Sequence, residues 1–479
     1  MRLAFAALAA VTLVRLAVAG LTPLSADEAY YWIWSRALAP GYLDHPPMVA
    51  LWIRAGTALF GDTAFGVRLL GPLGCAVGSA LLAWAGEDLL GDRRAGVRAA
   101  VLLNATLLFA IGSVTMTPDT PLLLFWVAAV WSLGRLVRSG AGGWWLAAGL
   151  FAGLACASKY TGFFLPAGIA VWALATPWGR RWLTTPWPWS GAFIGLLVFA
   201  PVIAWNAAHG WASFEKQGGR AGAWDAGRAA QFVGELVAGQ VGLATPLVFL
   251  LCMAGIVLAV RRWRDPRFLL LASLSALPVL IFLQHALGDR VQGNWPAIIY
   301  PAAAIAAAAL TAPFWRRMYR PAVWLGAVLT ALVYVQAAFA PFPLPFRADP
   351  TLLRLAGWDT MAGEVDAARR AAGADFIAAD GYGPASELAW HLPPGDVVVG
   401  LEPRWSLFAL PGAAVEGQTG LLVRSARRGD DIDMRPWSSI TEVGRIARGR
   451  GGFTAEEFRL FRVTARASEA AAVVLPRPR

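Results

Sequence analysis

Long apolar segments recur through the first 341 residues, and this repetition limits the fold more strongly than any other feature. A membrane-spanning helix needs about 20 mostly apolar residues. Such segments predict about eleven spans, near residues 3–21, 66–86, 96–116, 121–138, 144–158, 161–178, 190–207, 236–260, 268–286, 295–312 and 321–341. The first segment is expected to stay uncleaved, because Arg15 interrupts it. The chain is therefore predicted to be a polytopic all-α membrane protein.

Composition excludes two other classes of protein. The chain is 57% hydrophobic and only 15% charged, whereas a soluble protein is about 25% charged. Its 24 Trp and 24 Phe exclude intrinsic disorder. A net charge of +11 in a soluble protein would suggest nucleic acid. Here the arginines stand in short clusters between apolar segments, so no nucleic-acid partner is expected.

These arginine clusters predict the orientation of the chain. They fall in alternate loops, at residues 92–94, 135–138, 180–181, 261–264 and 316–317. Positively charged loops stay on the cytoplasmic side. The N-terminus is therefore predicted inside and the segment after residue 341 outside, in a multi-pass protein of the cell's inner membrane.

The distribution of charge divides the chain into two predicted domains. The transmembrane domain covers residues 1–341 and includes a large first outer loop, 22–65, whose aromatic residues suit helices in the membrane interface. Residues 346–479 contain no spanning segment and are predicted to form a small extracytoplasmic α/β domain. Its predicted helices are 359–372 and 383–392, and its predicted strands are 374–379, 397–400, 421–425, 440–447 and 458–464. The tail 476–479 is expected to be disordered.

Asp27 and Glu28 stand where the chain leaves the first apolar segment, in a loop predicted to face outward. Adjacent carboxylates are not needed for anchoring, and partial desolvation makes a carboxylate a stronger base. The alternative is that Ser25 or Asp27 caps a helix running through Tyr31.

Two further outer loops carry acids whose assignment the sequence leaves open. Asp44-His45-Pro46-Pro47 is either half of a metal site or proton relay, or a tight turn with a satisfied histidine. No HExxH motif supports a metal site. Asp119 either belongs to the site or caps the next helix, with Pro121 at its first helical position.

Two cations in loops of the same parity predict a site for an anionic headgroup. Lys159 follows an apolar segment and precedes Tyr160, and ionisable residues within membranes tend to be functional. Arg290 stands in the loop before Asn294. A compact ammonium suits a phosphate or pyrophosphate. The alternative is that each cation only anchors its loop at the interface.

Motifs for nucleotide binding are absent from the sequence. It contains no Walker A motif, no Rossmann fingerprint after a strand and no kinase signature. The sequence context of a nucleophile elbow is also missing. A site outside the membrane has no ATP or nucleotide sugar, so group transfer there must draw on a lipid-linked donor.

The order of these motifs resembles a known family. The matching elements are Asp27-Glu28 after the first span, Tyr30-Tyr31-Trp32, Gly41-Tyr42-Leu43-Asp44-His45-Pro46-Pro47, Ser158-Lys159-Tyr160-Thr161 and Gly293-Asn294-Trp295-Pro296. With the C-terminal outer domain, the chain resembles the polyprenyl-phosphate-sugar-dependent glycosyltransferases of the GT-C fold. These include the protein O-mannosyltransferases and the bacterial lipid A aminoarabinose and galacturonic acid transferases. The resemblance covers most of residues 1–340.

The resemblance implies an inverting sugar transfer from a polyprenyl phosphate to an envelope acceptor: lipid A, lipopolysaccharide core, another glycan or a protein. The family's first-loop aspartate corresponds to Asp27, as general base or acceptor-orienting group. Glu28 is a second carboxylate, and Asp119 takes the place of a later acidic residue. The predicted substrate-binding residues are Tyr30, Tyr31, Asp44, His45, Lys159, Tyr160, Arg290 and Asn294. Whether a divalent metal ion takes part is left open, since some relatives use one and others do not.

Two rival classes have distinct sequence expectations. A lipid or solute transporter would also have many spans, but it usually shows repeated halves and broken helices at mid-membrane. Neither is evident, and the charges lie at one face. An envelope polymerase or ligase of another fold would not need Asp-Glu directly after the first helix.

Overall fold

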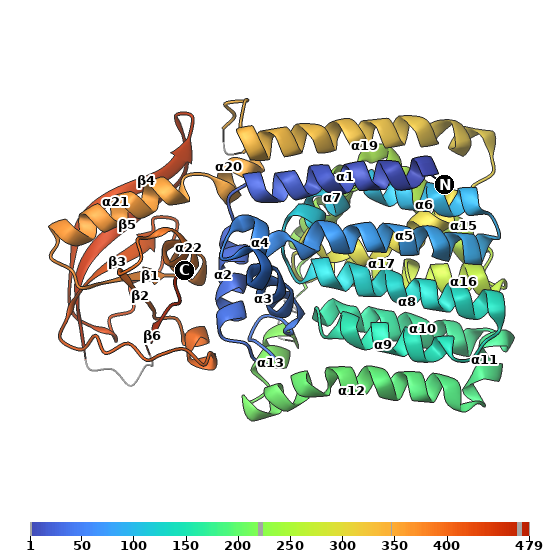
Figure 1. Cartoon of the computed structure of the whole chain (residues 1–479), viewed down its shortest axis with the longest axis horizontal. Helices are drawn as coiled ribbons and strands as arrows, with labels where there is room; N and C mark the ends of the chain where they lie inside the picture. The colour runs from blue at the N-terminus through green and yellow to red at the C-terminus, as the bar shows by residue number, and fades with distance from the viewer. Residues whose placement is uncertain (1, 219–223, 346, 467–471, 479) are drawn as a thin grey trace. The chain divides into compact units, whose positions relative to one another are not determined.

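The computed structural model describes residues 2–218, 224–345, 347–466 and 472–478 (Figure 1). The chain forms two compact units. The helical unit comprises Met1–Leu16, Leu43–Val49 and Leu70–Val333, and the sheet unit comprises Ala17–Tyr42, Ala50–Leu69 and Tyr334–Arg479. Three helices are divided between the units: α1 (Arg2–Leu21), α3 (Met48–Phe60) and α19 (Pro313–Phe339).

The helical unit is built of helices joined by short connections. They are α5 (Leu70–Leu90), α6 (Arg93–Asn104), α7 (Leu107–Val114), α8 (Asp119–Ser139), α9 (Trp144–Cys156), η1 (Tyr160–Phe163), α10 (Phe164–Ala175), α11 (Pro177–Leu183), α12 (Pro186–Ala208), α13 (Ala212–Gly218), α14 (Ala226–Leu243), α15 (Pro246–Arg261), α16 (Pro266–Ser273), α17 (Ala276–Ala286), η2 (Trp295–Ile299) and α18 (Tyr300–Ala308).

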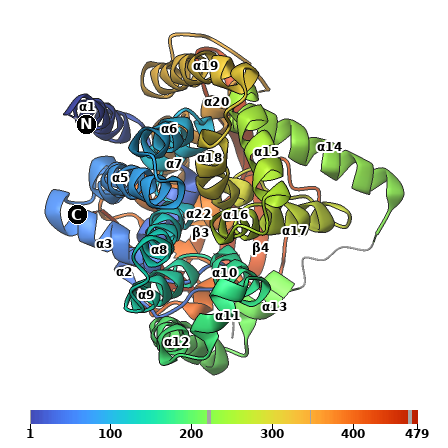
Figure 2. The same ribbon diagram turned by 90° about the vertical axis from the view of Figure 1, so that its right-hand side faces the viewer.

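Four of these helices lie side by side. Figure 2 looks along α5, α8, α9 and α12 and shows them in one row, in which neighbours pack together. Glycines let α9 and α12 approach closely. A Cβ atom added to Gly149 would lie 1.9 Å from the carbonyl oxygen of Gly191, and one added to Gly153 would lie 2.6 Å from that of Gly195. Small residues at such contacts are typical of helix packing in membranes.

The polytopic helical prediction is confirmed, whereas the number of spans stays a prediction. Among the described residues, 6 helices are long and apolar enough to cross a membrane, or up to 9 if each bent pair is one span. Each predicted segment falls on a helix or helix pair. Two segments, 144–158 and 295–312, coincide with shorter apolar helices, Trp144–Cys156 and Trp295–Ala308.

Three predicted segments contain a sharp break that hydropathy does not reveal. The helix axes bend by 71° between α6 and α7, by 107° between α10 and α11, and by 110° between α14 and α15. At the last break Thr245 has a φ of 63°, and Pro246, which lacks an N–H, begins α15. Segment 236–260 is therefore not the single helix that was predicted.

The sheet unit contains six strands in the order β4-β5-β3-β1-β2-β6. They are β1 (Phe376–Asp380), β2 (Val397–Gly400), β3 (Thr419–Ser425), β4 (Trp437–Arg450), β5 (Phe453–Ala465) and β6 (Val473–Val474). Strand β1 is parallel to both β2 and β3, and the other pairings are antiparallel. The unit's other elements are α2 (Ala26–Arg36), α4 (Ala64–Arg68), α20 (Pro350–Leu355), α21 (Trp358–Ala371), α22 (Tyr382–His391) and η3 (Pro403–Leu407).

The three parallel strands of the sheet, β1, β2 and β3, have their carboxyl ends at the same edge. Phe376, Val399, Leu422 and Phe461 form part of its core and fix β1 between its neighbours. The carboxyl ends of β1, β2 and β3 therefore meet at the edge where the chain enters α22 and η3. The α/β prediction for this region is confirmed, because every predicted helix and strand overlaps an observed one.

Residues 476–478, the described part of the tail that was expected to be disordered, include a side chain held by hydrogen bonds. Strand β6 pairs with β2, and the side chain of Arg477 donates to the carbonyl oxygen of Leu388 at 2.9 Å. The physical reason is that β6 pairs with β2 just before this tail and Arg477 binds a carbonyl oxygen near the end of α22.

Candidate active site

The first turn of α2 carries Asp27 and Glu28 and is held by its own side chains. Ser25 is the N-cap residue, with extended backbone angles of φ −89° and ψ 159°. Its backbone N–H and its hydroxyl both donate to Oε2 of Glu28, each at 3.0 Å. This capping arrangement satisfies groups that the start of a helix leaves open. Of the two capping alternatives in the sequence, the structure supports Ser25 rather than Asp27.

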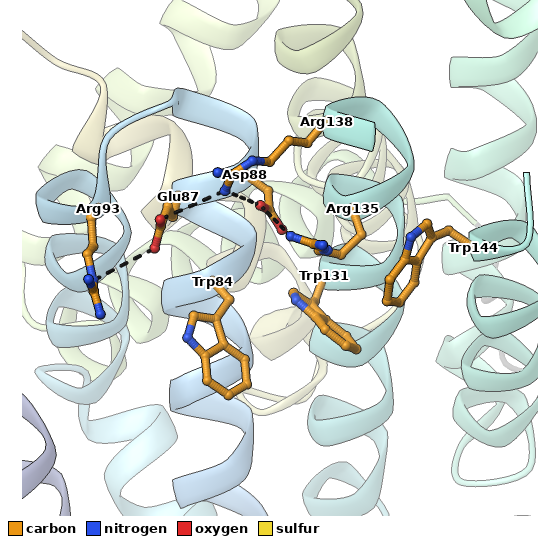
Figure 3. Close-up of a pocket in the computed structure, with 8 residues that line it drawn as sticks. All are labelled: Trp84, Glu87, Asp88, Arg93, Trp131, Arg135, Arg138 and Trp144. Carbon is orange, nitrogen blue, oxygen red and sulfur yellow. Dashed lines mark hydrogen bonds and ion pairs between the residues drawn. The ribbon is translucent and has the colours of Figure 1, made fainter. Parts of the chain in front are cut away.

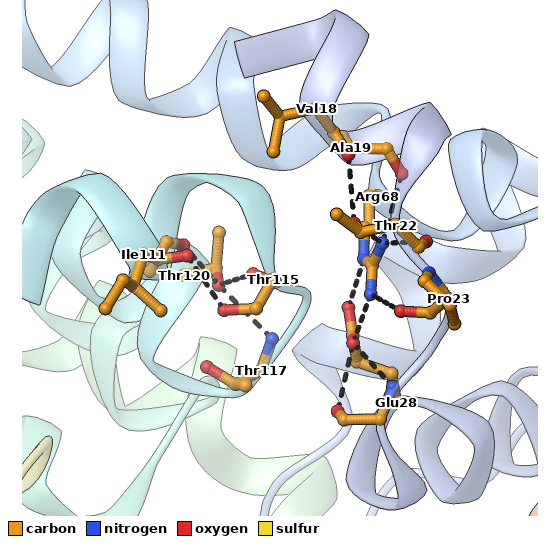
Figure 4. A network of polar contacts seen from close by, with 12 residues as sticks. Val18, Ala19, Thr22, Pro23, Glu28, Arg68, Ile111, Thr115, Thr117 and Thr120 are labelled. Carbon is orange, nitrogen blue, oxygen red and sulfur yellow. Dashed lines mark hydrogen bonds and ion pairs between the residues drawn. The ribbon is translucent and has the colours of Figure 1, made fainter. Parts of the chain in front are cut away.

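Arg68, the last residue of α4, binds the same glutamate (Figure 4). Its Nε donates to Oε1 of Glu28 at 2.6 Å, and its Nη2 donates to Oε2 at 2.7 Å. Its Nη1 also donates to the carbonyl oxygens of Ala19 at 3.1 Å and Thr22 at 2.7 Å. The two charged side chains are only 1% and 0% exposed. This pair ties the end of α1 to the start of α2, so Glu28 acts as a positioning residue.

Asp27 faces a different set of partners. The hydroxyl of Tyr382, the first residue of α22, donates to Oδ1 of Asp27 at 3.1 Å. The two helices come close because Gly383 has no side chain: an added Cβ would lie 3.3 Å from the Cβ of Ala26. Asp27 is only half-buried, in contrast to Glu28. Asp27 is therefore the carboxylate of this pair that can act on a bound ligand.

Aromatic rings and one arginine surround the contact between Asp27 and Tyr382. Tyr30, one helical turn after Asp27, packs on Tyr382 with ring centroids 4.5 Å apart. The guanidinium of Arg404 lies 4.2 Å from the ring centroid of Tyr382, and its Nη1 is 3.4 Å from the Tyr30 hydroxyl. Glu402 binds the Nε of Arg404 at 3.1 Å. Cation–π contact and ion pairing thus fix the arginine on the ring of Tyr382, the residue that binds Asp27.

Sequence reasoning missed Tyr382 and Arg404. They follow the carboxyl ends of β1 and β2, and open α/β sheets bind ligands at such ends. Gly381, with a φ of 134°, makes the turn between β1 and α22. A Gly-Tyr-Gly run after an apolar strand was the available signal, but Asp27 lies 355 positions away in the sequence.

In the helical unit, Asp119 and Lys159 form a buried ion pair. The Nζ of Lys159 lies 2.8 and 2.7 Å from the two carboxylate oxygens, and the Nδ2 of Asn294 donates to Oδ2 at 2.6 Å. Asp119 begins α8, Lys159 follows α9 and Asn294 precedes η2. The carboxylate of Asp119 therefore holds together the chain segments at these three helix ends. This geometry brings together three predicted residues and favours a brace at this end of the unit.

A second group in the helical unit surrounds Asp44. Lys216 of α13 forms an ion pair with the Asp44 carboxylate. The side chain of Tyr160 packs on Phe214 of the same helix, with ring centroids 5.5 Å apart. His45, beside Asp44, is half-buried. Two of the predicted binding residues, Asp44 and Tyr160, therefore meet at α13.

The remaining predicted residues are Arg290 in the helical unit and Tyr31, whose ring centroid lies 5.9 Å from that of Tyr30. Arg290 Nε binds Glu235 at 2.6 Å, and its side chain is 55% exposed. Tyr31, in the sheet unit, is buried with its ring 5.0 Å from that of Trp34. Arg290 is thus accessible to a ligand, whereas Tyr31 packs in the aromatic core of α2.

A further carboxyl group, Glu387, is buried in α22. Neither of its oxygens has a hydrogen-bond partner among the residues that the structure describes, and Nε2 of His391 lies 3.4 Å from Oε2. Burial raises the pKa of Glu387 to about 7. His391 and Arg448 oppose this rise, and the charge of Glu28 adds to it.

Whether a divalent metal ion takes part stays open. In the described part of the chain, no group of three or more His, Cys, Asp or Glu side chains could hold a metal ion. These residues therefore do not fit a metal ion held by three protein ligands.

Comparison with known proteins identifies the fold and the class. The crystal structure of ArnT from Cupriavidus metallidurans bound to undecaprenyl phosphate matches at a TM-score of 0.62, with 17% identity, over 97% of this chain and 98% of that one. The apo structure of the same protein matches at a TM-score of 0.57, with 15% identity, over 95% of this chain and 97% of that one. The family model for dolichyl-phosphate-mannose-protein mannosyltransferase matches residues 44–205. Lipid A galacturonosyltransferase RgtD from Rhizobium johnstonii is 27% identical over 372 residues, 78% of each chain. The chain is a glycosyltransferase of the GT-C fold. The predicted family resemblance is confirmed, and the transporter alternative is disfavoured.

The match to the mannosyltransferase family model includes only some of this glycosyltransferase's candidate residues. Asp44, Asp119 and Lys159 lie inside residues 44–205, whereas Asp27 and Arg290 lie outside. The likeness to ArnT concerns the fold. The roles of single residues therefore rest on their geometry in this chain.

Proposed function

We propose that this glycosyltransferase moves a sugar from a polyprenyl-phosphate donor onto a lipid A-type glycolipid, at the outer face of the cell's inner membrane. RgtD, by its name, acts on lipid A, and ArnT was crystallised with undecaprenyl phosphate. The alternating arginine clusters support an orientation in which the sheet unit is periplasmic. A lipid-linked donor fits a site without a nucleotide-binding motif.

The environment of Asp27 carries the proposal. As the acceptor oxygen attacks the anomeric carbon, its proton passes to the Asp27 carboxylate. The bond from that carbon to the phosphate oxygen breaks, and polyprenyl phosphate leaves with the electron pair. Tyr382 holds the carboxylate in one orientation through its 3.1 Å hydrogen bond. A positioned base of this kind contributes about a hundred- to ten-thousand-fold in rate.

The leaving phosphate needs a cation to stabilise its developing charge. Lys159 is committed to Asp119 in a buried pair, and separating such a pair is costly. Arg290 is exposed, and exposed ion pairs such as that with Glu235 contribute little stability. Arg290 can therefore exchange its carboxylate for a phosphate, so we assign it to phosphate binding in the helical unit and assign Lys159 to bracing the loops.

The test compares envelope glycolipids by mass spectrometry in cells that lack the gene and carry variant copies at equal membrane levels. Asp27→Asn keeps the size of the side chain but removes the base, so turnover should fall by about a hundred- to ten-thousand-fold. Tyr382→Phe keeps the base but loses its orienting bond, so turnover should fall by about tenfold.

Asp359→Asn is the matched control, because Asp359 is an exposed acid at the start of α21. It should transfer sugar at the wild-type rate. An Asp27→Asn enzyme within a few-fold of wild type would discard the base assignment. A glycolipid profile that does not change when the gene is removed would discard the acceptor.

A further inference from the structure

A pocket of about 410 Å³ opens among four helices of the helical unit (Figure 3). Helices α5 and α8 end there, and α6 and α9 begin there. Asp119 begins α8, whereas Arg138 lies in its last turn, and 21 residues of helix extend roughly 30 Å. The pocket is thus at the far end of α8 from the Asp119 brace, beside the arginine clusters.

A buried carboxylate with an unsatisfied oxygen lines this pocket. Asp88 is only 8% exposed. Its Oδ1 accepts hydrogen bonds from Arg138 at 2.8 Å and Arg135 at 3.3 Å. Its Oδ2 has no hydrogen-bond partner within the described chain. A buried acceptor without a partner is costly, so a ligand that donates a hydrogen bond to it gains affinity.

Tryptophan rings form one wall of the pocket. The ring centroids of Trp84 and Trp131 are 6.3 Å apart, and those of Trp131 and Trp144 are 5.2 Å apart. Trp84 continues an exposed apolar stripe of α5 through Val77 and Leu73. These residues share one helix face, which suits contact with acyl chains. The wall therefore joins a lipid-facing surface to the buried carboxylate.

Guanidinium groups stand at the mouth of the pocket. The side chains of Arg93 and Arg138 are more than half exposed, and both approach Glu87, at 4.0 and 3.8 Å. Exposed guanidinium groups bind phosphate oxygens well. Cations at the mouth, with a carboxylate and aromatic faces inside, match a ligand that carries both a phosphate and an ammonium group.

We propose that this pocket binds the headgroup of a phospholipid with a primary ammonium, of the phosphatidylethanolamine type. The ammonium donates to Oδ2 of Asp88 beside Trp131. The phosphodiester contacts Arg138, and the acyl chains follow the exposed stripe of α5. A choline headgroup has no N–H to donate, so phosphatidylcholine with identical chains is the matched comparison.

The test measures lipid binding to the purified protein in detergent by native mass spectrometry. Phosphatidylethanolamine should bind about tenfold more tightly than phosphatidylcholine, which is what one charged hydrogen bond supplies. Trp84→Ala should weaken the binding of both lipids, because its ring joins the pocket to the stripe that the acyl chains follow, whereas Asp88→Asn should remove the preference. Trp324→Ala should retain it, because Trp324 is an exposed tryptophan of α19 outside the pocket.

Three results would overturn the proposal: equal binding of the two lipids, tighter binding of phosphatidylglycerol than of phosphatidylethanolamine, or a preference that survives Asp88→Asn. If Asp88→Asn fails to fold, Trp84→Ala still tests the site, since 41% of Trp84 is exposed and its loss leaves the core intact. Unchanged binding of phosphatidylethanolamine by this variant would overturn the proposal. Sugar transfer is not part of the readout, so the outcome is independent of the proposed function.

Discussion

Two glutamates of the sheet unit are fully buried, but their surroundings differ. Glu28 receives the guanidinium of Arg68 and the cap of α2, so its charge is compensated. Glu387 has His391 at 3.4 Å and no hydrogen bond among the described residues. Burial without a partner disfavours the charged form of a carboxyl group. The two residues therefore give opposite expectations for the same substitution.

Glu387→Gln should stabilise the protein at high pH. The folded pKa of about 7 lies above the ordinary value of 4.5. Between these values the folded state keeps a proton that the unfolded chain releases, so the stability of the wild type falls as pH rises. The variant does not titrate. Its advantage in thermal unfolding should grow from pH 5 to pH 8, to on the order of a few kcal/mol.

Glu28→Gln is the matched control and should destabilise the protein, whereas Glu387→Gln should stabilise it. Glu28→Gln leaves Arg68 buried without its anionic partner, which costs about 3–5 kcal/mol at neutral pH. A Glu387→Gln variant whose advantage over the wild type is the same at pH 5 and pH 8 would contradict the assignment of the titration to this carboxyl.

The sequence indicated Asp27 but not its neighbours, for a physical reason. Asp27 and Ser25 belong to one short motif with local capping chemistry, which spacing reveals. Tyr382 reaches Asp27 only because α22 packs on α2, and Arg404 packs in turn on Tyr382; no local pattern encodes these contacts. Glu28 was predicted as a second acid for catalysis. Its partner Arg68 is 40 positions away, so its commitment to an ion pair was not visible either.

At the scale of elements, the packing of α9 on α12 depends on glycines that face each other. Gly149→Ala should destabilise the protein, because the added Cβ would meet the carbonyl oxygen of Gly191 at 1.9 Å. Overpacking of this kind costs about 1–3 kcal/mol. The measurement is thermal unfolding of the purified protein in one detergent.

Gly234→Ala provides the matched control on α14. An added Cβ there meets nothing within 4 Å, so the variant should gain about 0.5–1 kcal/mol from helix propensity. Equal melting temperatures for the two alanine variants would show that the contact between α9 and α12 is not tight in solution.

Hydropathy located the helices because lipid-facing and core residues are both apolar in a membrane protein. It could not locate their breaks, since an apolar run continues through Thr245 and Pro246 while the hydrogen-bonded ladder ends. In the sheet unit the alternation of strand and helix predicted α21, α22 and strands β1 to β5, but not the short elements α20, η3 and β6. It did not give the order of the strands, which depends on long-range pairing.

At the scale of the whole molecule, the helix ends sort by charge. Arginines stand in the first turns of α6 (93–94) and α19 (316–317). They also stand in the last turns of α8 (135–138) and at the end of α15 and directly after it (261–264). Asp119, by contrast, begins α8, at the opposite end of that helix. This separation agrees with a cytoplasmic end rich in arginine and the Asp119 brace at the other end of the helical unit.

The orientation is tested by two reporter fusions. Alkaline phosphatase, which is active only outside the cytoplasm, should be active when fused after Pro478. The same enzyme fused after Arg264 should be inactive, because that loop holds an arginine cluster. A cytoplasmic reporter at the two positions should give the opposite pattern. An inactive phosphatase after Pro478 together with an active one after Arg264 would show that the orientation in the membrane is the opposite of the predicted one. The site would then face the nucleotide sugars of the cytoplasm, and the argument for a lipid-linked donor would lose its basis.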